Sequence, residues 1–391
     1  MIPFNEAFEL IMQDIPLMGV ERINFSISLG RVLRQDVISD LDMPPFDKSA
    51  MDGYACRMQD IDKTLKVIEV IPAGKIPERF VSERECSKIM TGAIVPGGAD
   101  CVMKVEDTEV PEEGYVRYTG HATRSNIARK GEDVKTGAVV LRDGLQIQPQ
   151  HIAVMASVGC VEPFVSKMVR VGVLSTGDEI VEPERKPGPS QIRNSNGYQL
   201  FAQIMRSSAE PVYYGIAEDS AAATREIIEK AMDECDVVLL TGGVSMGDFD
   251  FIPGVLDDLG TEILFKTVAI QPGKPTVFCK MNDKRIFGLP GNPVSSFNTF
   301  EIFVRPLIMK MMGWNGSFPT YRLPMGKKYR RKKSHRMSWM PVMIGGDGKV
   351  YPMEYHGSAH IHALSDAHGM IALPVGATEL KEGEMVNVRP I

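Results

Sequence analysis

Hydrophobic residues change their spacing several times along this chain. They recur at helical intervals within residues 5–18, and residues 23–29 then alternate between apolar and polar, which is the period of a β-strand. Glycine and proline interrupt residues 44–137 and leave short β-like runs such as CVMKVE between them. This order predicts an N-terminal helix, a change of period and then a small β-rich region.

Residues 168–312 alternate between apolar runs of strand length and amphipathic stretches of helical length. The runs VRVGVL, PVYYGI, DVVLL and RIFGL lie between helices expected near 196–207, at 219–233, up to Gly260 and at 293–312. Strands and helices at this spacing form βαβ units around a parallel sheet, which binds ligands at the carboxyl ends of its strands. We therefore predict an α/β domain with a site along that edge.

The remaining segments predict a division into four parts. GLQIQPQHIAVMASVG has the pattern of a strand followed by a helix that ends at Gly159, and we expect it to return to the N-terminal segment. Short strands resume near residue 318, and ALPVGATELKEGEMVNVRPI is typical of a β-barrel fragment. The expected fold combines α/β and β domains. Its parts are a discontinuous domain at 1–43 and 138–167, an inserted β-rich domain at 44–137, an α/β domain at 168–316 and a C-terminal β domain at 317–391.

Composition narrows the class of protein. A chain of 391 residues is too long for one core, and 43% hydrophobic with 24% charged residues is typical of soluble proteins, without an apolar run of membrane-spanning length. Glu6, Glu9 and Asp14 interrupt the apolar N-terminus, which a signal peptide would not allow. The six cysteines lie singly, without a C-x-x-C pair. We expect a cytoplasmic, multidomain enzyme with reduced thiols and no membrane association.

The charge of the chain argues against a nucleic-acid partner, because the formal net charge is −6. One basic run, KKYRRKK at 327–333, departs from this balance. It is either a solvated loop or strand edge, or a surface that guides an anionic substrate or partner.

Three glycine-containing loops follow strands of the α/β region: STGDEI, TGGVSMGDFD and GLPGNPVSS. We expect them to converge at one edge of the sheet, where glycine-rich turns and a helix start present free N–H groups to an anion. Asn292 is placed to cap a helix that begins at Pro293. Each motif taken alone also fits a simple turn or cap. The candidate ligand-binding residues here are Ser175, Thr176, Gly177, Gly242, Gly243, Ser245, Pro290, Gly291, Asn292 and Pro293.

Carboxylates lie in the same loops, at Glu179, Asp248 and Asp250. Two like charges ~5 Å apart cost ~3 kcal/mol at an effective dielectric constant of ~20, so an anion site with these groups calls for a metal. Oxygen donors favour magnesium. Asp250 and Asp219 are also placed to cap helices, and for both residues the two interpretations stay open.

Three further segments carry candidate chemistry. In AIQPGKPTVF, Lys274 and Pro275 lie in a stiff loop that fixes one cation for an anion, although a surface lysine in a turn fits too. MPPFDKSAMDGYA is either a rigid domain junction or a preorganised site. The tail histidines His356, His360, His362 and His368 lack a helix that would align them, which disfavours metal ligation.

Together these motifs resemble those of the molybdopterin molybdenumtransferase family, which includes MoeA and the E domain of gephyrin. The segments MPPFDKSAMDGYA, IMTGAIVPGGAD, RKGEDV, STGDEI, TGGVSMGDFDF, QPGKP and GLPGNPVSS carry the resemblance. The TGG and GNP loops alone would also fit MogA-type adenylyltransferases, whereas SAMDGYA would not. The resemblance implies a discontinuous dimerisation domain, an inserted β-rich domain, a MogA-like α/β domain and a C-terminal β-barrel.

The resemblance also implies a reaction and a site. Adenylylated molybdopterin and molybdate are the expected substrates, AMP is released, and magnesium is the cofactor, held by Asp52, Glu179 and Asp250. In the implied homodimer, Asp52, Thr91 and Asp133 reach the partner's site. Asp52, Glu179, Asp219, Asp250 and Lys274 are the expected catalytic residues, and Lys274, Arg336 and Ser358 the expected molybdate-holding set.

The family's chemistry suggests an upstream adenylyltransferase and downstream molybdoenzymes as further partners. Gln271 departs from the pattern, because relatives often carry lysine before PGKP, so the preference for molybdate over tungstate is open. A tungsten-specific enzyme, a pterin-binding scaffold without turnover and an adenylyltransferase are the alternatives.

Overall fold

The computed structural model describes residues 1–218, 220–243, 252–353, 357 and 359–391. The chain divides into two compact units. The large unit comprises Met1–Gln35, Gly144–Gln148 and Phe164–Ile391, and the small unit comprises Asp36–Asp143 and Pro149–Pro163. Among the described residues, no helix combines the length and apolar character that crossing a membrane requires.

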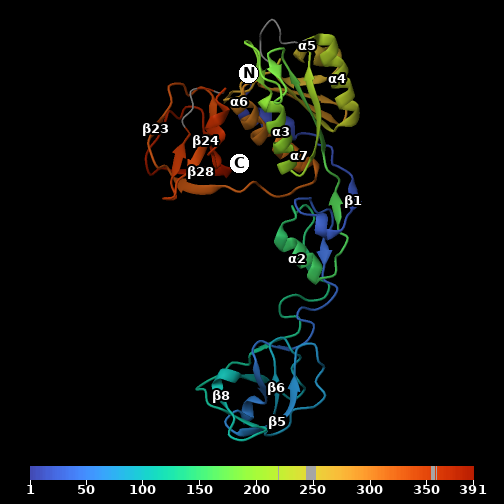
Figure 1. The fold of residues 1–391 in the computed structure, drawn as a ribbon, viewed down its shortest axis with the longest axis vertical. Helices are drawn as coiled ribbons and strands as arrows, with labels where there is room; N and C mark the ends of the chain where they lie inside the picture. The colour runs from blue at the N-terminus through green and yellow to red at the C-terminus, as the bar shows by residue number, and fades with distance from the viewer. Residues whose placement is uncertain (219, 244–251, 354–356, 358) are drawn as a thin grey trace. The chain divides into compact units, whose positions relative to one another are not determined.

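A mixed sheet forms the centre of the large unit (Figure 1). Its strands, as far as the chain is described, lie in the order β16-β13-β17-β21-β20-β18. The first four run parallel to one another, β20 runs antiparallel to β21, and β18 runs antiparallel to β20. Their bounds are β13 Arg170–Thr176, β16 Glu210–Ala217, β17 Val237–Thr241, β18 Glu262–Phe265, β20 Val277–Met281 and β21 Lys284–Leu289. The predicted α/β domain with a mostly parallel sheet is confirmed.

Helices cover both faces of this sheet, as Figure 1 shows. Val237 and Leu239 of β17 pack with α3 and the α6–α7 region, whereas Val238 and Leu240 pack with α4 and α5. Successive side chains of a strand point to opposite faces, so a strand buried on both faces needs a continuous apolar run, which DVVLL supplies. Full burial of each such side chain contributes about 1.5–3 kcal/mol. The helices are α3 Ser195–Arg206, α4 Ala221–Glu234, α5 Ile252–Asp258, α6 Pro293–Thr299, the π-helix η4 Phe300–Val304 and α7 Arg305–Met311.

A second sheet of the large unit begins inside the α/β segment. Its order is β19-β24-β26-β28-β22, with β25 paired to β24, among the residues that the structure describes. The bounds are β19 Ile270–Gln271, β22 Tyr321–Pro324, β24 Met337–Ile344, β25 Val350–Pro352, β26 Gly369–Leu373 and β28 Met385–Pro390, with the 3-10 helix η5 at Ile361–Leu364. The predicted tail of short strands is confirmed.

The basic run lies at the edge of the same region. β23 (Tyr329–Arg330) pairs with β27 (Glu379–Leu380), and Lys328 and Arg330 form ion pairs with Glu379. This pairing fits the strand-edge interpretation of KKYRRKK.

The N-terminal elements differ from one expectation. The helix is present as α1 (Phe4–Met12), and β1 (Val20–Arg22) pairs with β12 (Phe164–Ser166). The alternating residues 23–29 do not form a strand, because Phe25–Ile27 is the 3-10 helix η1. The side chain of Asn24 accepts a hydrogen bond from the Ser26 N–H at 3.0 Å. Such a local bond offers the backbone an alternative to strand pairing.

The small unit is rich in β-structure, as predicted for residues 44–137. Its main sheet has the order β7-β4-β6-β5-β9-β8 in the described chain. The elements are β2 Val37–Ile38, β3 Lys48–Ser49, β4 Gly53–Cys56, η2 Met58–Asp60, β5 Thr64–Ile71, β6 Glu85–Ile89, β7 Cys101–Lys104, η3 Val105–Asp107, β8 Thr108–Glu109, β9 Tyr115–Tyr118, β10 Ile127–Ala128, β11 Val139–Leu141 and α2 Pro149–Ser157.

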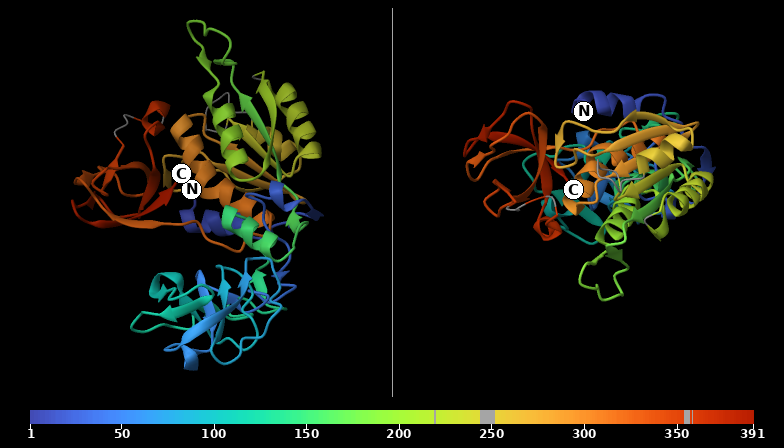
Figure 2. Two further views of the ribbon diagram at one scale, coloured as in Figure 1. Left: turned by 60° about the horizontal axis from the view of Figure 1, so that its bottom comes forward. Right: turned by 90° about the horizontal axis from the view of Figure 1, so that it is seen from above.

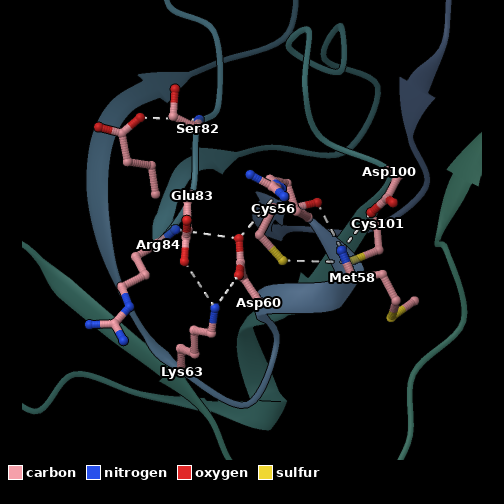
Figure 3. Close-up of polar contacts among 11 residues, drawn as sticks. Cys56, Met58, Asp60, Lys63, Ser82, Glu83, Arg84, Asp100 and Cys101 are labelled. Carbon is pink, nitrogen blue, oxygen red and sulfur yellow. Dashed lines mark hydrogen bonds and ion pairs between the residues drawn. The ribbon is translucent and has the colours of Figure 1, made fainter.

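A buried carboxylate connects the turn after β4 to the start of β6 (Figure 3). Asp60 is 1% exposed, and its carboxylate accepts hydrogen bonds from Lys63 Nζ at 2.7 Å and from the Arg84 N–H at 3.3 Å. The bond from Lys63 is the main cause that lowers the pKa of Asp60 below its ordinary value of 3.8; burial opposes this shift, and the Arg84 N–H adds to it. The ionised carboxylate therefore stabilises the small unit.

The substitution Asp60→Asn is expected to destabilise the protein in a pH-dependent way. A carboxyl whose pKa is lowered on folding contributes stability above the unfolded pKa, and this contribution is lost as the pH falls through the folded pKa. The difference in free energy of unfolding between wild type and variant should therefore be largest near pH 7 and decrease below about pH 4. Denaturant unfolding at a series of pH values measures it. Asp62→Asn, at an exposed neighbour, is the matched control, and a difference independent of pH would contradict the assignment.

Candidate functional site

Three loops meet because the strands before them end at the same level of the sheet. Ser175 on β13 is in register with Thr241 on β17, and Thr241 is in register with Leu289 on β21. A cavity of about 1210 Å³ opens there. The predicted residues that line it are Ser175, Thr176, Glu179, Gly242, Gly243, Pro275, Pro290, Gly291, Asn292 and Pro293. The predicted convergence of the loops is confirmed.

The TGG turn needs glycine because two backbones approach closely. Gly242 has φ +91°, and a Cβ atom there would lie 2.3 Å from the carbonyl oxygen of Thr176. Gly243 has φ +60°, and a Cβ atom there would lie 3.0 Å from Thr176 Oγ1. A larger residue would therefore separate the first two loops and reshape the cavity.

Glu179 folds back over its own loop. Gly177 has φ +133°, and a Cβ atom on Gly177 would lie 2.3 Å from Glu179 Oε2. The Ile192 N–H donates to the Glu179 carbonyl oxygen at 2.7 Å, and the adjacent short strands β14 (Ile180–Val181) and β15 (Ile192–Arg193) pair in parallel. Figure 2 shows the segment between β14 and β15 (green) extending away from the sheet. Glu179 lines the cavity, whereas Gly177 does not.

The GNP loop begins a helix as predicted, with Asn292 at the cap position and Pro293 as the first helical residue. The expected capping bond is absent, because the Asn292 side chain accepts no hydrogen bond from the first turn of α6. That part of the prediction is wrong. The Asn292 side chain is exposed and faces the cavity, where it is available to a ligand.

The second sheet brings the lysine loop and Arg336 together. Ile270 on β19 is in register with Met337 on β24, and Arg336 Nη1 donates to the Ile270 carbonyl oxygen at 3.3 Å. Arg336 Nε is buried without a hydrogen-bond partner among the described residues, and Lys274 is exposed. Pro275 lines the cavity, whereas Lys274 and Arg336 do not. Two cations thus lie on segments that are joined by one short strand pair.

In the small unit, Thr91 holds the Asp52 carboxylate. Asp52 Oδ1 accepts hydrogen bonds from the Thr91 N–H at 2.6 Å and from Thr91 Oγ1 at 2.7 Å. These bonds, the backbone one first, lower the pKa of Asp52. Asp133 is exposed and makes no hydrogen bond to either residue in the described chain. Thr91 therefore positions Asp52 through Oδ1 and keeps it an exposed, ionised carboxylate.

Five candidate residues, Asp219, Ser245, Asp248, Asp250 and Ser358, lie outside the described residues, as does His356. Capping of α4 is performed by Ser220, whose side chain accepts a hydrogen bond from the Ala223 N–H at 3.2 Å. The predicted cap at Asp219 is therefore not needed for this helix.

Three family models together match nearly all of the chain. They are the MoeA N-terminal region (domain I and II) at residues 2–159, the probable molybdopterin binding domain at 172–310 and the MoeA C-terminal region (domain IV) at 323–391. A protein of Staphylococcus epidermidis described as molybdopterin molybdenumtransferase is 33% identical over 99% of this chain and 95% of its own length. A protein of Staphylococcus aureus with the same description is equally similar.

The chain belongs to the molybdopterin molybdenumtransferase (MoeA) family. A crystal structure described as the molybdopterin biosynthesis moeA protein of Pyrococcus horikoshii OT3 has a TM-score of 0.86 and 28% identity, and covers 100% of both chains. A second MoeA structure from this species has a TM-score of 0.80 and 31% identity, and covers 100% of this chain and 98% of its own. The MoeA-type fold therefore extends over the whole length.

The MoeA-family cavity contains residues that the sequence reasoning missed. Asn194 and Asn196 at the start of α3 line it, and so do His360, directly before η5, and His362 within η5. The sequence N-S-N directly before a predicted helix was an available signal for the two asparagines, because asparagine favours helix starts. For the two histidines the sequence raises only metal ligation, which their pattern disfavours. They give no signal for this cavity, because it is contact between η5 and α6 that places their segment there.

Ser175 is held by a chain of hydrogen bonds in this MoeA-family site. Asn194 Nδ2 donates to Ser175 Oγ at 3.0 Å and to Tyr213 Oη at 2.8 Å, and Tyr213 donates to Glu182 at 2.8 Å. Burial, followed by the bond to Glu182, raises the pKa of Tyr213. The tyrosine therefore stays a neutral donor, which fixes the wall of the cavity.

No group of three or more His, Cys, Asp or Glu side chains is arranged to hold a metal ion within the described ranges. Glu179 is the acidic residue among the described lining of the MoeA-family cavity. A metal held there would need oxygen donors from elsewhere, such as a phosphate.

The substitution Thr91→Val is expected to raise the pKa of Asp52 toward its ordinary value of 3.8, because valine removes the Oγ1 bond but keeps the backbone N–H bond. A carbon-detected NMR titration of the side-chain carboxyls measures the midpoint, with Asp52→Asn to assign the signal. An unchanged midpoint would show that the hydroxyl does not contribute.

Proposed function

We propose that this chain transfers molybdenum from molybdate to adenylylated molybdopterin, with release of AMP. The observation that carries the proposal is the cavity in which the TGG, STGDE and GNP loops converge. The relatives described as molybdopterin molybdenumtransferases, with 33% identity over almost the full length, support the same reaction.

The size and lining of the cavity support a ligand of this kind. Its volume of about 1210 Å³ exceeds the roughly 300–1,000 Å³ of common small-molecule sites, so it has room for a dinucleotide-sized ligand. The Gly242 N–H itself donates to the Leu289 carbonyl oxygen at 3.4 Å. The N–H groups proposed for phosphate oxygens are therefore that of Gly243 in the same turn and those of the first turn of α6 after Pro293. We assign the phosphates to these loops.

Lys274 and Arg336 are the residues proposed to hold molybdate. A tetrahedral dianion suits two cations, and the buried Arg336 Nε without a described partner supports an anion beside it. Ser358, which lies outside the described residues, is the proposed hydroxyl donor. The positive charges of Lys274 and Arg336 would lower the repulsion between molybdate and the phosphates during transfer.

Magnesium is the proposed cofactor. Glu179 offers an exposed carboxylate on the cavity wall, and magnesium characteristically combines one or two carboxylates with phosphate oxygens and water. The proposed further ligands are Asp250, outside the described residues, and Asp52. When bound, the metal would neutralise phosphate charge as AMP leaves.

The finer architecture is also part of the proposal. We propose a homodimer in which Asp52, Thr91 and Asp133 of one subunit complete the site of the other, a dimerisation domain at 1–43 and 138–167, and a C-terminal β-barrel. An upstream adenylyltransferase and downstream molybdoenzymes are the proposed partners. The buried cysteines Cys56, Cys86, Cys101, Cys235 and Cys279 form no disulfide within the described residues, which fits the proposed reducing, cytoplasmic compartment.

Purified protein is expected to release AMP from adenylylated molybdopterin only when molybdate and magnesium are present. Lys274→Ala should weaken molybdate use about ten-fold to a hundred-fold, the loss expected for one charge-assisted hydrogen bond. Lys310→Ala, on α7, is the matched control. Release without molybdate would contradict the proposal, and preferential use of tungstate would identify the tungsten enzyme that Gln271 permits.

Two impaired variants are expected to regain activity when mixed, if Asp52 acts across the dimer. In a heterodimer of Asp52→Ala and Lys274→Ala subunits, one site keeps both residues and the other loses both. Complete subunit exchange should leave roughly a quarter of all sites intact. AMP release before and after exchange measures this. Mixed protein whose AMP release does not rise, despite exchange shown by mass spectrometry, would place Asp52 in its own subunit's site.

A further inference from the structure

Asn196 joins the two loops that we assign to phosphate. It lies in the first turn of α3, is 9% exposed and lines the cavity. Its Nδ2 donates to Thr241 Oγ1 at 2.9 Å and to the carbonyl oxygen of Gly291 at 2.7 Å. One amide group therefore uses both of its N–H bonds to connect the end of β17 with the loop after β21.

The orientation of this amide is fixed by chemistry. The Gly291 carbonyl can only accept a hydrogen bond, so the NH₂ group of Asn196 must face it and Oδ1 must face elsewhere. Asn196 Oδ1 is buried and has no hydrogen-bond partner in the part of the chain that is described. Thr176 Oγ1 is also buried and has no hydrogen-bond partner among the described residues. Thr176 is 6% exposed and lines the same cavity.

Buried polar atoms without partners are rare, and in native proteins they have an explanation such as a bound ligand or an ordered water. Both atoms are covered in the structure but belong to residues that line the cavity, so a ligand bound in the cavity is the source of a donor that we consider. A phosphate oxygen cannot satisfy Asn196 Oδ1, because an ionised phosphate only accepts hydrogen bonds. The missing group is therefore an O–H or N–H donor.

We propose that Asn196 Oδ1 accepts a hydrogen bond from an O–H or N–H group that lies next to the phosphate of the bound ligand. The inference rests on the proposed function, and it makes Asn196 a specificity-determining residue. Two parts of adenylylated molybdopterin carry such donors beside a phosphate, namely the ribose and adenine of the nucleotide half and the ring system of the pterin half. The Thr176 hydroxyl can donate or accept, so it is a second group on the cavity lining that a ligand can satisfy.

Asn194 offers a matched control. It is two residues away, 3% exposed and also lines the cavity. Its Oδ1, in contrast, already accepts hydrogen bonds from the Gly197 N–H at 3.0 Å and from Ser175 Oγ at 3.2 Å. Asn194→Ala therefore disturbs the start of α3 and the cavity wall without removing an acceptor that awaits a ligand.

The test compares the affinities of AMP and of molybdopterin, each titrated separately by calorimetry under anaerobic conditions with magnesium. Wild type, Asn196→Ala and Asn194→Ala are measured, and thermal unfolding checks that each variant is folded. Asn196→Ala should weaken one half of the ligand about ten-fold more than the other, because only one half supplies the donor. Asn194→Ala should change both affinities by similar factors.

The outcomes separate the hypotheses. A selective loss for AMP identifies the nucleotide as the source of the donor, and a selective loss for molybdopterin identifies the pterin. Equal losses for both halves, or none, would overturn the proposal and leave Asn196 as a brace whose Oδ1 is satisfied by water. Wild-type protein that binds neither AMP nor molybdopterin would instead refute the proposed function itself.

Discussion

The register of three parallel strands is the constraint on which the site depends. β13, β17 and β21 are paired so that Ser175, Thr241 and Leu289 end at one level. Parallel strands all emerge at the same edge, so the loops that follow them must share space. A shift of one residue in β17 would turn Val238 and Leu240 toward the wrong helices and withdraw Thr241 from the cavity. Packing of both faces thus fixes the chemistry at the edge.

The loops after β13, β17 and β21 approach one another closely at that edge, so their contacts are made by glycine and by a buried amide side chain. Gly242 is required because a Cβ atom there would lie only 2.3 Å from the Thr176 carbonyl oxygen. Asn196 then connects the two loops that the strands bring together, with bonds of 2.9 and 2.7 Å to Thr241 and Gly291. Glycine removes the steric conflict, and the amide fixes the separation. The resulting cavity is preorganised, so little ordering remains to be done when a ligand binds.

The charged side chains are positioned by short strand pairs and local hydrogen bonds, not by the register of the central sheet. The short strand β19 belongs to the second sheet, and its pairing with β24 carries Arg336 to the loop that contains Lys274. In the small unit, Thr91 fixes the Asp52 carboxylate and lowers its pKa. Cations and carboxylates therefore arise on segments that are distant in sequence, each held by backbone pairing or by a local hydrogen bond.

Periodicity and turn chemistry in the sequence determined the elements and the three loops. The run DVVLL, the TGG turn and the Asn292–Pro293 helix start were all predicted, because burial on both faces, positive φ and the fixed φ of proline are local requirements. Local competition also caused the error at 23–29, where the Asn24 side chain favours a 3-10 turn. Only the tertiary structure decided which groups face the cavity. The roles of Asn196, His360 and Thr91 are set by contacts between segments that are distant in the sequence. Such contacts produce no periodic pattern of residues from which they could be predicted.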